Sequence, residues 1–138
     1  MLLLDTNVVS ELRRIGTGRA DANFQKWADD VDLAHCFISV ITVMEVERGV
    51  ISKEAKDGAQ GRVLRAWFEQ KVLGEFSGRI LAVELSDARI CASMHTPHIR
   101  PENDTVLAAT AKRAGLTVVT RNVKDFSALD VPYINPWA

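Results

Sequence analysis

The chain opens with residues 1–7, MLLLDTN, and this stretch decides the fold class. Three consecutive leucines are typical of a short strand buried on both faces, as in parallel sheets. The strand runs directly into Asp5, which is followed by Thr6 and Asn7. Two interpretations are open at this point. Asp5 or Thr6 caps a following helix, or Asp5 is a ligand at the edge of the sheet where the strand ends.

Short apolar runs separated by helical patterns predict the rest of the sheet. The predicted strands are residues 2–4, 36–40, 80–83, 116–120 and a shorter one at 133–134. Apolar residues at helical spacing predict helices over 62–76 and 105–114, the second ending at Gly115. Strands that alternate with helices pair in parallel through right-handed crossovers. We therefore expect one α/β domain over residues 1–138, a three-layer α/β/α sandwich around a mainly parallel sheet of about five strands.

Composition bounds the function. The 138 residues are 47% hydrophobic and 25% charged, and the net charge of −1 excludes the global positive charge typical of many nucleic-acid binders. A nucleic acid would have to be held by local basic residues. No apolar run approaches the roughly 18 residues of a membrane helix, and the N-terminus has no signal-peptide pattern, so we expect a cytoplasmic protein. Cys36 and Cys91 lack metal-binding spacing and are predicted to be buried free thiols.

Acidic and amide side chains recur where predicted strands end and helices begin. Ligands of open α/β sheets bind at the carboxyl ends of the strands, and several candidates fall there. The first follows strand 2–4, the second lies in the helix after strand 36–40, the third opens helix 105–114, and the last two follow strand 116–120. These candidates are Asp5, Glu45, Asp104, Asn122 and Asp125.

Each acid also has a purely structural interpretation. Either Ser39 or Thr42 can cap the helix after the second strand, and Thr42 as the N-cap would make Glu45 the N3 residue of a capping box. Asp104 is an expected cap, and Asp125 could start a turn. The coincidence of four acids at one edge favours a site, because converging carboxylates repel each other and are stabilised by a cation.

Oxygen ligands without a partner histidine or cysteine suit Mg²⁺ or Mn²⁺. Such an ion pairs naturally with phosphate oxygens, activates water and neutralises charge in the transition state. The residues alone thus suggest hydrolysis of a phosphodiester.

Four stretches together resemble the PIN-domain ribonucleases, and most of all the VapC-type toxins of bacterial toxin–antitoxin pairs. They are LLLDTNVVSEL, ISVITVMEVERGV, ENDTVLAATAKRAGLTVVTRNVKDF and INPW, in this order over essentially the full chain. The resemblance implies a PIN-like fold and a Mg²⁺- or Mn²⁺-dependent endoribonuclease that cleaves RNA. It also implies a cognate antitoxin as partner, a homodimer and a larger toxin–antitoxin assembly.

The resemblance also assigns site residues by position. The family's first three acids, its metal ligands, fall on Asp5, Glu45 and Asp104. The small polar pair after the first acid is Thr6 and Asn7, which would contact substrate. Many relatives have a fourth acid where this chain has Asn122. Either Asn122 serves as a neutral ligand, or Asp125 replaces that acid from one helical turn further on.

Other features bear on partners. Arg121 and Lys124 flank Asn122 and are the favoured phosphate contacts among the basic residues. The stretch 63–68 could be core or part of a groove that receives an antitoxin helix. Two competing functions stay open: a non-catalytic PIN-fold binding module, which Asn122 would suit, and an aspartyl-phosphate phosphohydrolase with Asp5 as nucleophile. The second usually has an acid/base Asp where this chain has Asn7.

Overall fold

The computed structural model describes residues 1–138 and contains a five-stranded parallel sheet in the order β3-β2-β1-β4-β5. All five predicted strands are confirmed, and most are shorter than the apolar runs. They are β1 (Leu2–Leu4), β2 (Cys36–Ser39), β3 (Ile80–Leu81), β4 (Thr117–Val119) and β5 (Tyr133–Ile134).

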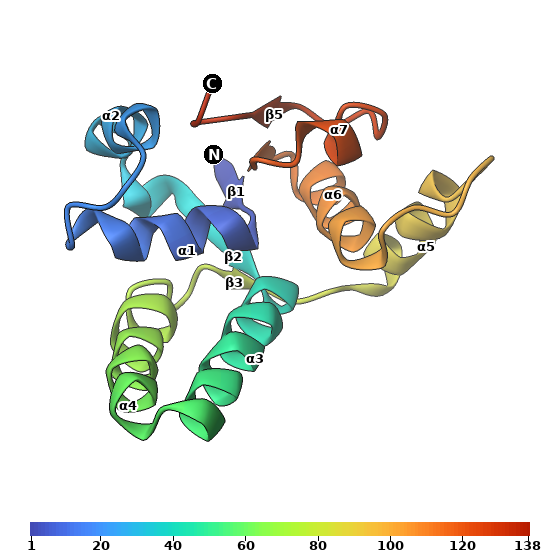
Figure 1. The fold of residues 1–138 in the computed structure, drawn as a ribbon. Helices are drawn as coiled ribbons and strands as arrows, with labels where there is room; N and C mark the ends of the chain where they lie inside the picture. The colour runs from blue at the N-terminus through green and yellow to red at the C-terminus, as the bar shows by residue number, and fades with distance from the viewer.

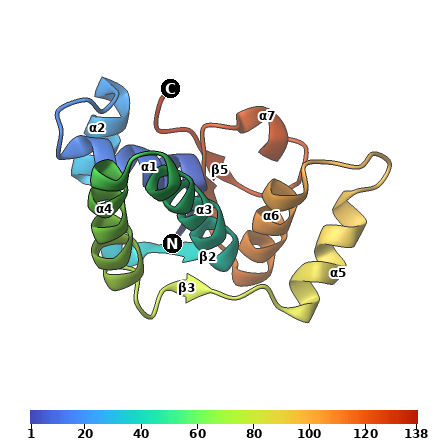
Figure 2. The same ribbon diagram turned by 60° about the horizontal axis from the view of Figure 1, so that its bottom comes forward.

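Helices cover the sheet on both faces, as the α/β/α prediction requires. Figures 1 and 2 show α1 to α4 on one side of the strands and α5 to α7 on the other, with α5 outermost against α6. The helices are α1 (Thr6–Ile15), α2 (Ala22–Asp30), the 3-10 turn η1 (Leu33–His35), α3 (Val40–Lys56), α4 (Gly58–Trp67), the π-helical η2 (Phe68–Gly74), α5 (Leu85–Met94), α6 (Glu102–Ala114) and α7 (Val123–Phe126). None of these helices combines the length and apolarity needed to span a membrane.

Two apolar clusters fill the space between the three layers. Successive side chains of a strand point to opposite faces, and β1 shows the consequence. Leu4 packs with Phe24 of α2 and Val50 of α3, whereas Leu3 packs with Leu107 of α6, and all five side chains are fully or almost fully buried. The leucine run therefore supplies both halves of the core. Cys36 and Cys91 are buried free thiols, as predicted.

The strand order reverses at β1. The chain moves from β1 outward through β2 to β3, then returns to the other side of β1 to form β4 and β5. β1 and β4 pair from Leu2↔Thr117 to Leu4↔Val119, and the N–H of Asp5 still donates to the carbonyl of Val119 at 2.9 Å. Because β1 and β4 are parallel neighbours with diverging connections, their carboxyl ends form the switch point where α/β sheets bind ligands.

The starts of α3 and α6 correct two structural interpretations of the acids. Ser39 caps α3, its Oγ accepting from the N–H of Ile41 at 3.0 Å. The capping box through Thr42 is wrong, because Thr42 lies inside the helix and Glu45 is therefore not its N3 residue. α6 begins at Glu102, three residues earlier than predicted. Asp104 lies in its first turn and does not cap it, since the N-cap is Pro101.

A close helical hairpin joins α3 to α4. The break between the two helices occurs at Asp57, which ends α3 and caps α4 by accepting from the N–H of Gln60. The helices then pack closely at Gly61, where an added Cβ would lie 2.6 Å from the Cα of Glu54. The predicted single helix over 62–76 is interrupted, because its second half continues as η2.

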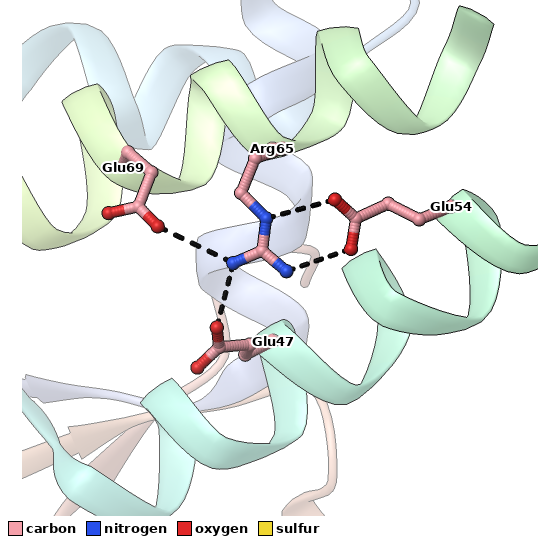
Figure 3. A network of polar contacts seen from close by, with 4 residues as sticks. All are labelled: Glu47, Glu54, Arg65 and Glu69. Carbon is pink, nitrogen blue, oxygen red and sulfur yellow. Dashed lines mark hydrogen bonds and ion pairs between the residues drawn. The ribbon is translucent and has the colours of Figure 1, made fainter. Parts of the chain in front are cut away.

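One arginine links the hairpin on its outer side. Figure 3 shows Arg65 of α4 between two glutamates of α3, with a third from η2. Its guanidinium contacts Glu47 at 2.7 Å, Glu54 at 2.8 Å and Glu69 at 3.4 Å. These charged groups are half-buried or exposed, so the network aligns the helices without the desolvation cost of a buried ion pair.

Candidate active site

Asp5 lies at the switch point and has two roles in the local structure. It is the N-cap of α1, with Oδ1 accepting from the N–H of Thr6 at 2.7 Å. Its other oxygen, Oδ2, accepts from the Thr120 hydroxyl at 2.7 Å and the Asn7 amide at 3.3 Å. Burial and the nearby charge of Glu45 raise the pKa of Asp5, against the lowering effect of these hydrogen bonds. The side chain is held rigidly, with little exposure to solvent.

Glu45 reaches the same place from α3. The Thr6 hydroxyl donates to its Oε1 at 2.6 Å, and the Asn103 amide donates to its Oε2 at 3.3 Å. Thr6 lies at the start of α1 and Asn103 in the first turn of α6. Three helices from three parts of the chain therefore orient this one carboxylate.

Asp104 completes the group from α6 and is the most strongly perturbed of the acids. Burial raises its pKa from 3.8 to about 7, together with the negative charges of Asp5, Asp125 and Glu45 and a hydrogen bond shared with the Asp125 carboxyl group. The structure thus brings together Asp5, Glu45, Asp104 and Asp125. None of these four carboxyl groups forms an ion pair with a lysine, arginine or histidine.

Asn122 differs in placement from Asp125. It is exposed at the N-terminus of α7, where its backbone N–H donates to the Thr120 hydroxyl at 2.9 Å and its side chain makes no capping hydrogen bond. Arg121 and Lys124 are exposed on the same connection. The N–H of Arg121 donates to the Asn7 Oδ1 at 3.3 Å, which ties this connection to the start of α1.

Sequence comparison settles the family. The PIN domain model matches residues 2–132. The chain belongs to the PIN-domain family. It is 38% identical to toxin FitB of Neisseria gonorrhoeae over 143 residues, covering 99% of both proteins. It is 32% identical to the VapC ribonuclease Y4jK of Sinorhizobium fredii over 142 residues, covering 99% of this chain and 98% of that protein.

Structural comparison agrees. A solved structure of FitAB bound to an IR36 DNA fragment contains a chain that superposes with a TM-score of 0.88 at 37% identity, covering 100% of this chain and 96% of the other. The resemblance of the four sequence stretches to PIN domains is therefore confirmed, together with the PIN-like fold.

The acidic site has the chemistry of a divalent-cation site, and ribonucleases of the PIN-domain family generally use divalent metal ions. Hard, oxygen-only donors of this kind suit Mg²⁺ or Mn²⁺. Burial, together with the uncompensated negative charge of the other acids in the cluster, raises the pKa of Asp104. The residues present therefore fit the cation that the family implies.

Two residues that hold this PIN-domain site were not identified from the sequence. Thr120 donates to Asp5 and accepts from Asn122, and Asn103 donates to Glu45. Thr120 is fully buried at the end of β4, where a buried hydroxyl needs a partner. In the sequence, Thr120 is visible only as a threonine at the end of an apolar strand, and Asn103 only as the neighbour of Asp104. Without the sheet order, neither position indicates which carboxylate its side chain will contact.

A second group of ligand-type side chains lies between α5 and α6. The Sγ of Cys91, one nitrogen of His95 and one oxygen of Glu102 all lie within 4.8 Å of one another. However, the His95 Nδ1 accepts from the N–H of Arg100 at 2.9 Å. The neutral ring therefore carries its proton on Nε2, which faces Cys91 and Glu102, and has no lone pair left for a metal. This group ties the loop before α6 in place.

Proposed function

We propose that this PIN-domain protein is a Mg²⁺- or Mn²⁺-dependent endoribonuclease and the toxin of a toxin–antitoxin pair, acting in the cytoplasm. The single observation that carries the proposal is the convergence of four carboxyl groups, from Asp5, Glu45, Asp104 and Asp125, on the carboxyl edge of the sheet without a basic partner. The relatives named toxin and ribonuclease support the same function.

Asp5, Glu45 and Asp104 would hold the cation, with Asp125 beside Asp104. When bound, the ion supplies Lewis acidity for the attack of water on an RNA phosphodiester. The chain's own part is positioning. Thr120 and Thr6 fix the first two carboxylates through hydroxyl groups, and the hydrogen bond from Thr120 favours the ionised form of Asp5. Without metal, burial and the surrounding negative charges raise the pKa of Asp104 to about 7, so its carboxyl group is only partly ionised at neutral pH.

Substrate would approach over the connection from β4 to α7. We propose that Arg121 and Lys124 contact RNA phosphates there, while Thr6 and Asn7 line the site beside Asp5. Single-stranded RNA is the expected target, because its bases can be splayed away from the cleaved backbone.

A groove beside α1 offers a site for the antitoxin. A cavity of about 440 Å³ lies between α1, α2 and η2, and eight of its thirteen lining residues are hydrophobic. Of the stretch 63–68, Trp67 lines this groove, Phe68 belongs to the core and Val63 is exposed. We propose that an amphipathic helix of the antitoxin docks here.

We also propose a homodimer. Val40, Met44 and Ile51 place exposed apolar side chains along α3, a face that a second copy of the chain could cover. A dimer of toxins, each with its antitoxin, would form the larger assembly.

The structure weakens both competing functions. Asp5 is only 3% exposed and both of its oxygens accept hydrogen bonds, so it is a poor nucleophile for an aspartyl-phosphate intermediate. The binding-module alternative rested on Asn122 in place of a fourth acid. Asp125, from the next turn, supplies a fourth carboxyl group beside Asp104 and so weakens that alternative.

The test is cleavage of total cellular RNA by purified protein in Mn²⁺, in Mg²⁺ and in EDTA, with Asp5→Asn as the matched variant. Discrete fragments that require both the metal and Asp5 are expected. Intact RNA in every lane, from folded protein free of antitoxin, would instead support the binding module.

A further inference from the structure

Arg121 lies next to the acidic site and rests on an aromatic ring. Its guanidinium carbon lies 5.2 Å from the centroid of the Trp137 ring, a cation–π contact. Its backbone N–H donates to Asn7, whose amide donates in turn to Asp5. The arginine is thus connected to the site through its backbone and stacked on the C-terminal segment through its side chain.

The Trp137 ring is itself held firmly. It packs on the buried ring of Phe24, with centroids 4.8 Å apart and the planes tilted by 41°. The backbone carbonyl of Trp137 accepts from the Asn23 side-chain amide at 3.1 Å, and the backbone N–H of Trp137 donates to the Asn135 Oδ1 at 3.0 Å. α2 therefore fixes the position of the ring on which Arg121 stacks.

Arg121 has no acidic partner. It forms no ion pair, although four carboxyl groups lie at the neighbouring site, and its side chain is exposed. A guanidinium that stacks through its face keeps its N–H groups in the plane of the group free to donate. Stacking also restricts a long, flexible side chain, so less conformational entropy is lost when an anion binds.

We propose that Trp137 is a positioning residue for RNA: it holds the Arg121 guanidinium ready to bind a backbone phosphate beside the acidic site. This inference rests on the proposed ribonuclease function and goes beyond it. A phosphate that approaches the acidic cluster is repelled by whatever negative charge a cation does not offset, and the net charge of −1 gives no general attraction. A fixed local cation offsets that repulsion at the point where substrate enters.

Steady-state cleavage of an RNA substrate tests the proposal through the split between KM and kcat. Trp137→Ala is expected to raise KM about threefold to tenfold and to leave kcat close to wild type. Trp137→Phe, which keeps an aromatic face, is expected to fall between the two. Trp27→Ala is the matched control, because Trp27 also packs on Phe24, at 5.4 Å, but does not contact Arg121. Its KM is expected to stay at the wild-type value.

Binding measurements separate this inference from the proposed catalysis. Labelled single-stranded RNA of mixed sequence is titrated against proteins that all carry Asp5→Asn, so that none can cleave it. Arg121→Ala is expected to weaken binding and to reduce the salt slope of log K by about one unit. Adding Trp137→Ala to Arg121→Ala is expected to cause no further loss, because Trp137 acts through the arginine.

Three outcomes would overturn the proposal. The first is an equal rise in KM for Trp137→Ala and Trp27→Ala, which would indicate a general effect on packing. The second is a further loss of binding when Trp137→Ala is added to Arg121→Ala. The third is a fall in kcat with KM unchanged. If Trp137→Ala does not fold, the same comparisons are made with Trp137→Phe. Absence of metal-dependent cleavage by wild type would refute the proposed function, while the binding titrations would still test Trp137.

Discussion

At the scale of single residues, the site depends on carboxyl groups that are costly to keep together. Asp5 is buried, yet each of its oxygens has a hydrogen-bond donor, which stabilises its charge. Asp104 lacks comparable donors, and burial together with the charges of three other acids raises its pKa to about 7. The concentration of uncompensated carboxyl groups destabilises the metal-free protein, and the same concentration makes the cluster a strong ligand for a cation.

The raised pKa of Asp104 has a consequence for stability. Between pH 3.8 and about 7 the native carboxyl keeps its proton whereas the unfolded one has lost it. Asp104 therefore lowers the free energy of unfolding as pH rises through this range. Asp104→Asn removes the effect, so the variant should become progressively more stable than metal-free wild type towards pH 7. Urea unfolding of both proteins in EDTA, at a series of pH values, measures the difference.

Mn²⁺ should reverse that order at neutral pH, because only wild type retains the full ligand set and a bound ion stabilises the native state. RNA cleavage by the variant should be lost while its circular dichroism spectrum is unchanged. A constant stability difference across the pH range would contradict the assignment of the shift to Asp104.

Asp125 and Asn122 make different predictions. Asp125→Asn removes the carboxyl group that shares a hydrogen bond with Asp104 and should reduce the cleavage rate by about 10- to 100-fold. Asn122→Ala should stay close to the wild-type rate, because its side chain is exposed and makes no capping hydrogen bond. Single-turnover cleavage in Mn²⁺ compares the two. The reverse order of effects would identify Asn122 as the fourth ligand.

At the scale of elements, helices bring the acids to the edge, and their packing must be close. α3 carries Glu45 and forms a hairpin with α4 that has no room for a side chain at Gly61. Across the sheet, α5 is anchored to α6 by the fully buried Asp87, which receives hydrogen bonds from Arg113 and Thr110. These contacts hold the helices without taking part in the site.

The hairpin offers a paired test. Gly61→Ala places a methyl group against the backbone of Glu54 and should lower the free energy of unfolding by about 1–3 kcal/mol. Gly49→Ala, within α3 with nothing near the added Cβ, should raise it by about 0.5–1 kcal/mol. Chemical denaturation measures both. If Gly61→Ala proved neutral, the close approach of α3 and α4 would be incorrect.

At the scale of the whole molecule, the proposed sites for RNA and antitoxin are separate but share α1. Asp5 caps this helix at the sheet edge, and further along it Val9 and Leu12 line the apolar groove. An antitoxin helix bound in the groove would contact the same element that positions the first acid. The groove residues are not members of the acidic cluster, however, so substitutions in the groove can change its occupation without changing the ligands of the site.

Ala28→Arg tests that separation. Ala28 lines the groove from α2 and lies outside the acidic cluster, so a long charged side chain there should block the antitoxin and leave RNA cleavage intact. Ala59→Arg, on the exposed start of α4, is the control and should bind the antitoxin normally. Co-purification with the cognate antitoxin measures the first effect, and cleavage of total RNA measures the second. Full antitoxin binding by Ala28→Arg would place the interface elsewhere.

Features of this molecule that depend on neighbouring residues could be predicted from the sequence, whereas features that depend on contacts between distant residues could not. Strands were predicted because an apolar run such as residues 2–4 signals burial locally, and Gly115 ends α6 with φ of 69°, as its type suggested. The cap of α3 was ambiguous between Ser39 and Thr42, because both are suitable and only the packed helix shows where the turn begins. The choice between Asn122 and Asp125 was open for a similar reason. The two residues are three positions apart, and only the folded turn at the start of α7 shows that Asp125 is the one beside Asp104.

The sequence by itself determined the layered α/β fold and the edge at which the acids gather, because periodicity and strand direction are properties of neighbouring residues. The tertiary structure alone decided which hydroxyl, amide and aromatic groups support them. Thr120 and Asp5 are 115 positions apart, and Asn23 and Trp137 are 114 apart. Such pairs form because the sheet order and the packing of its helices bring them together, and no local pattern encodes that order.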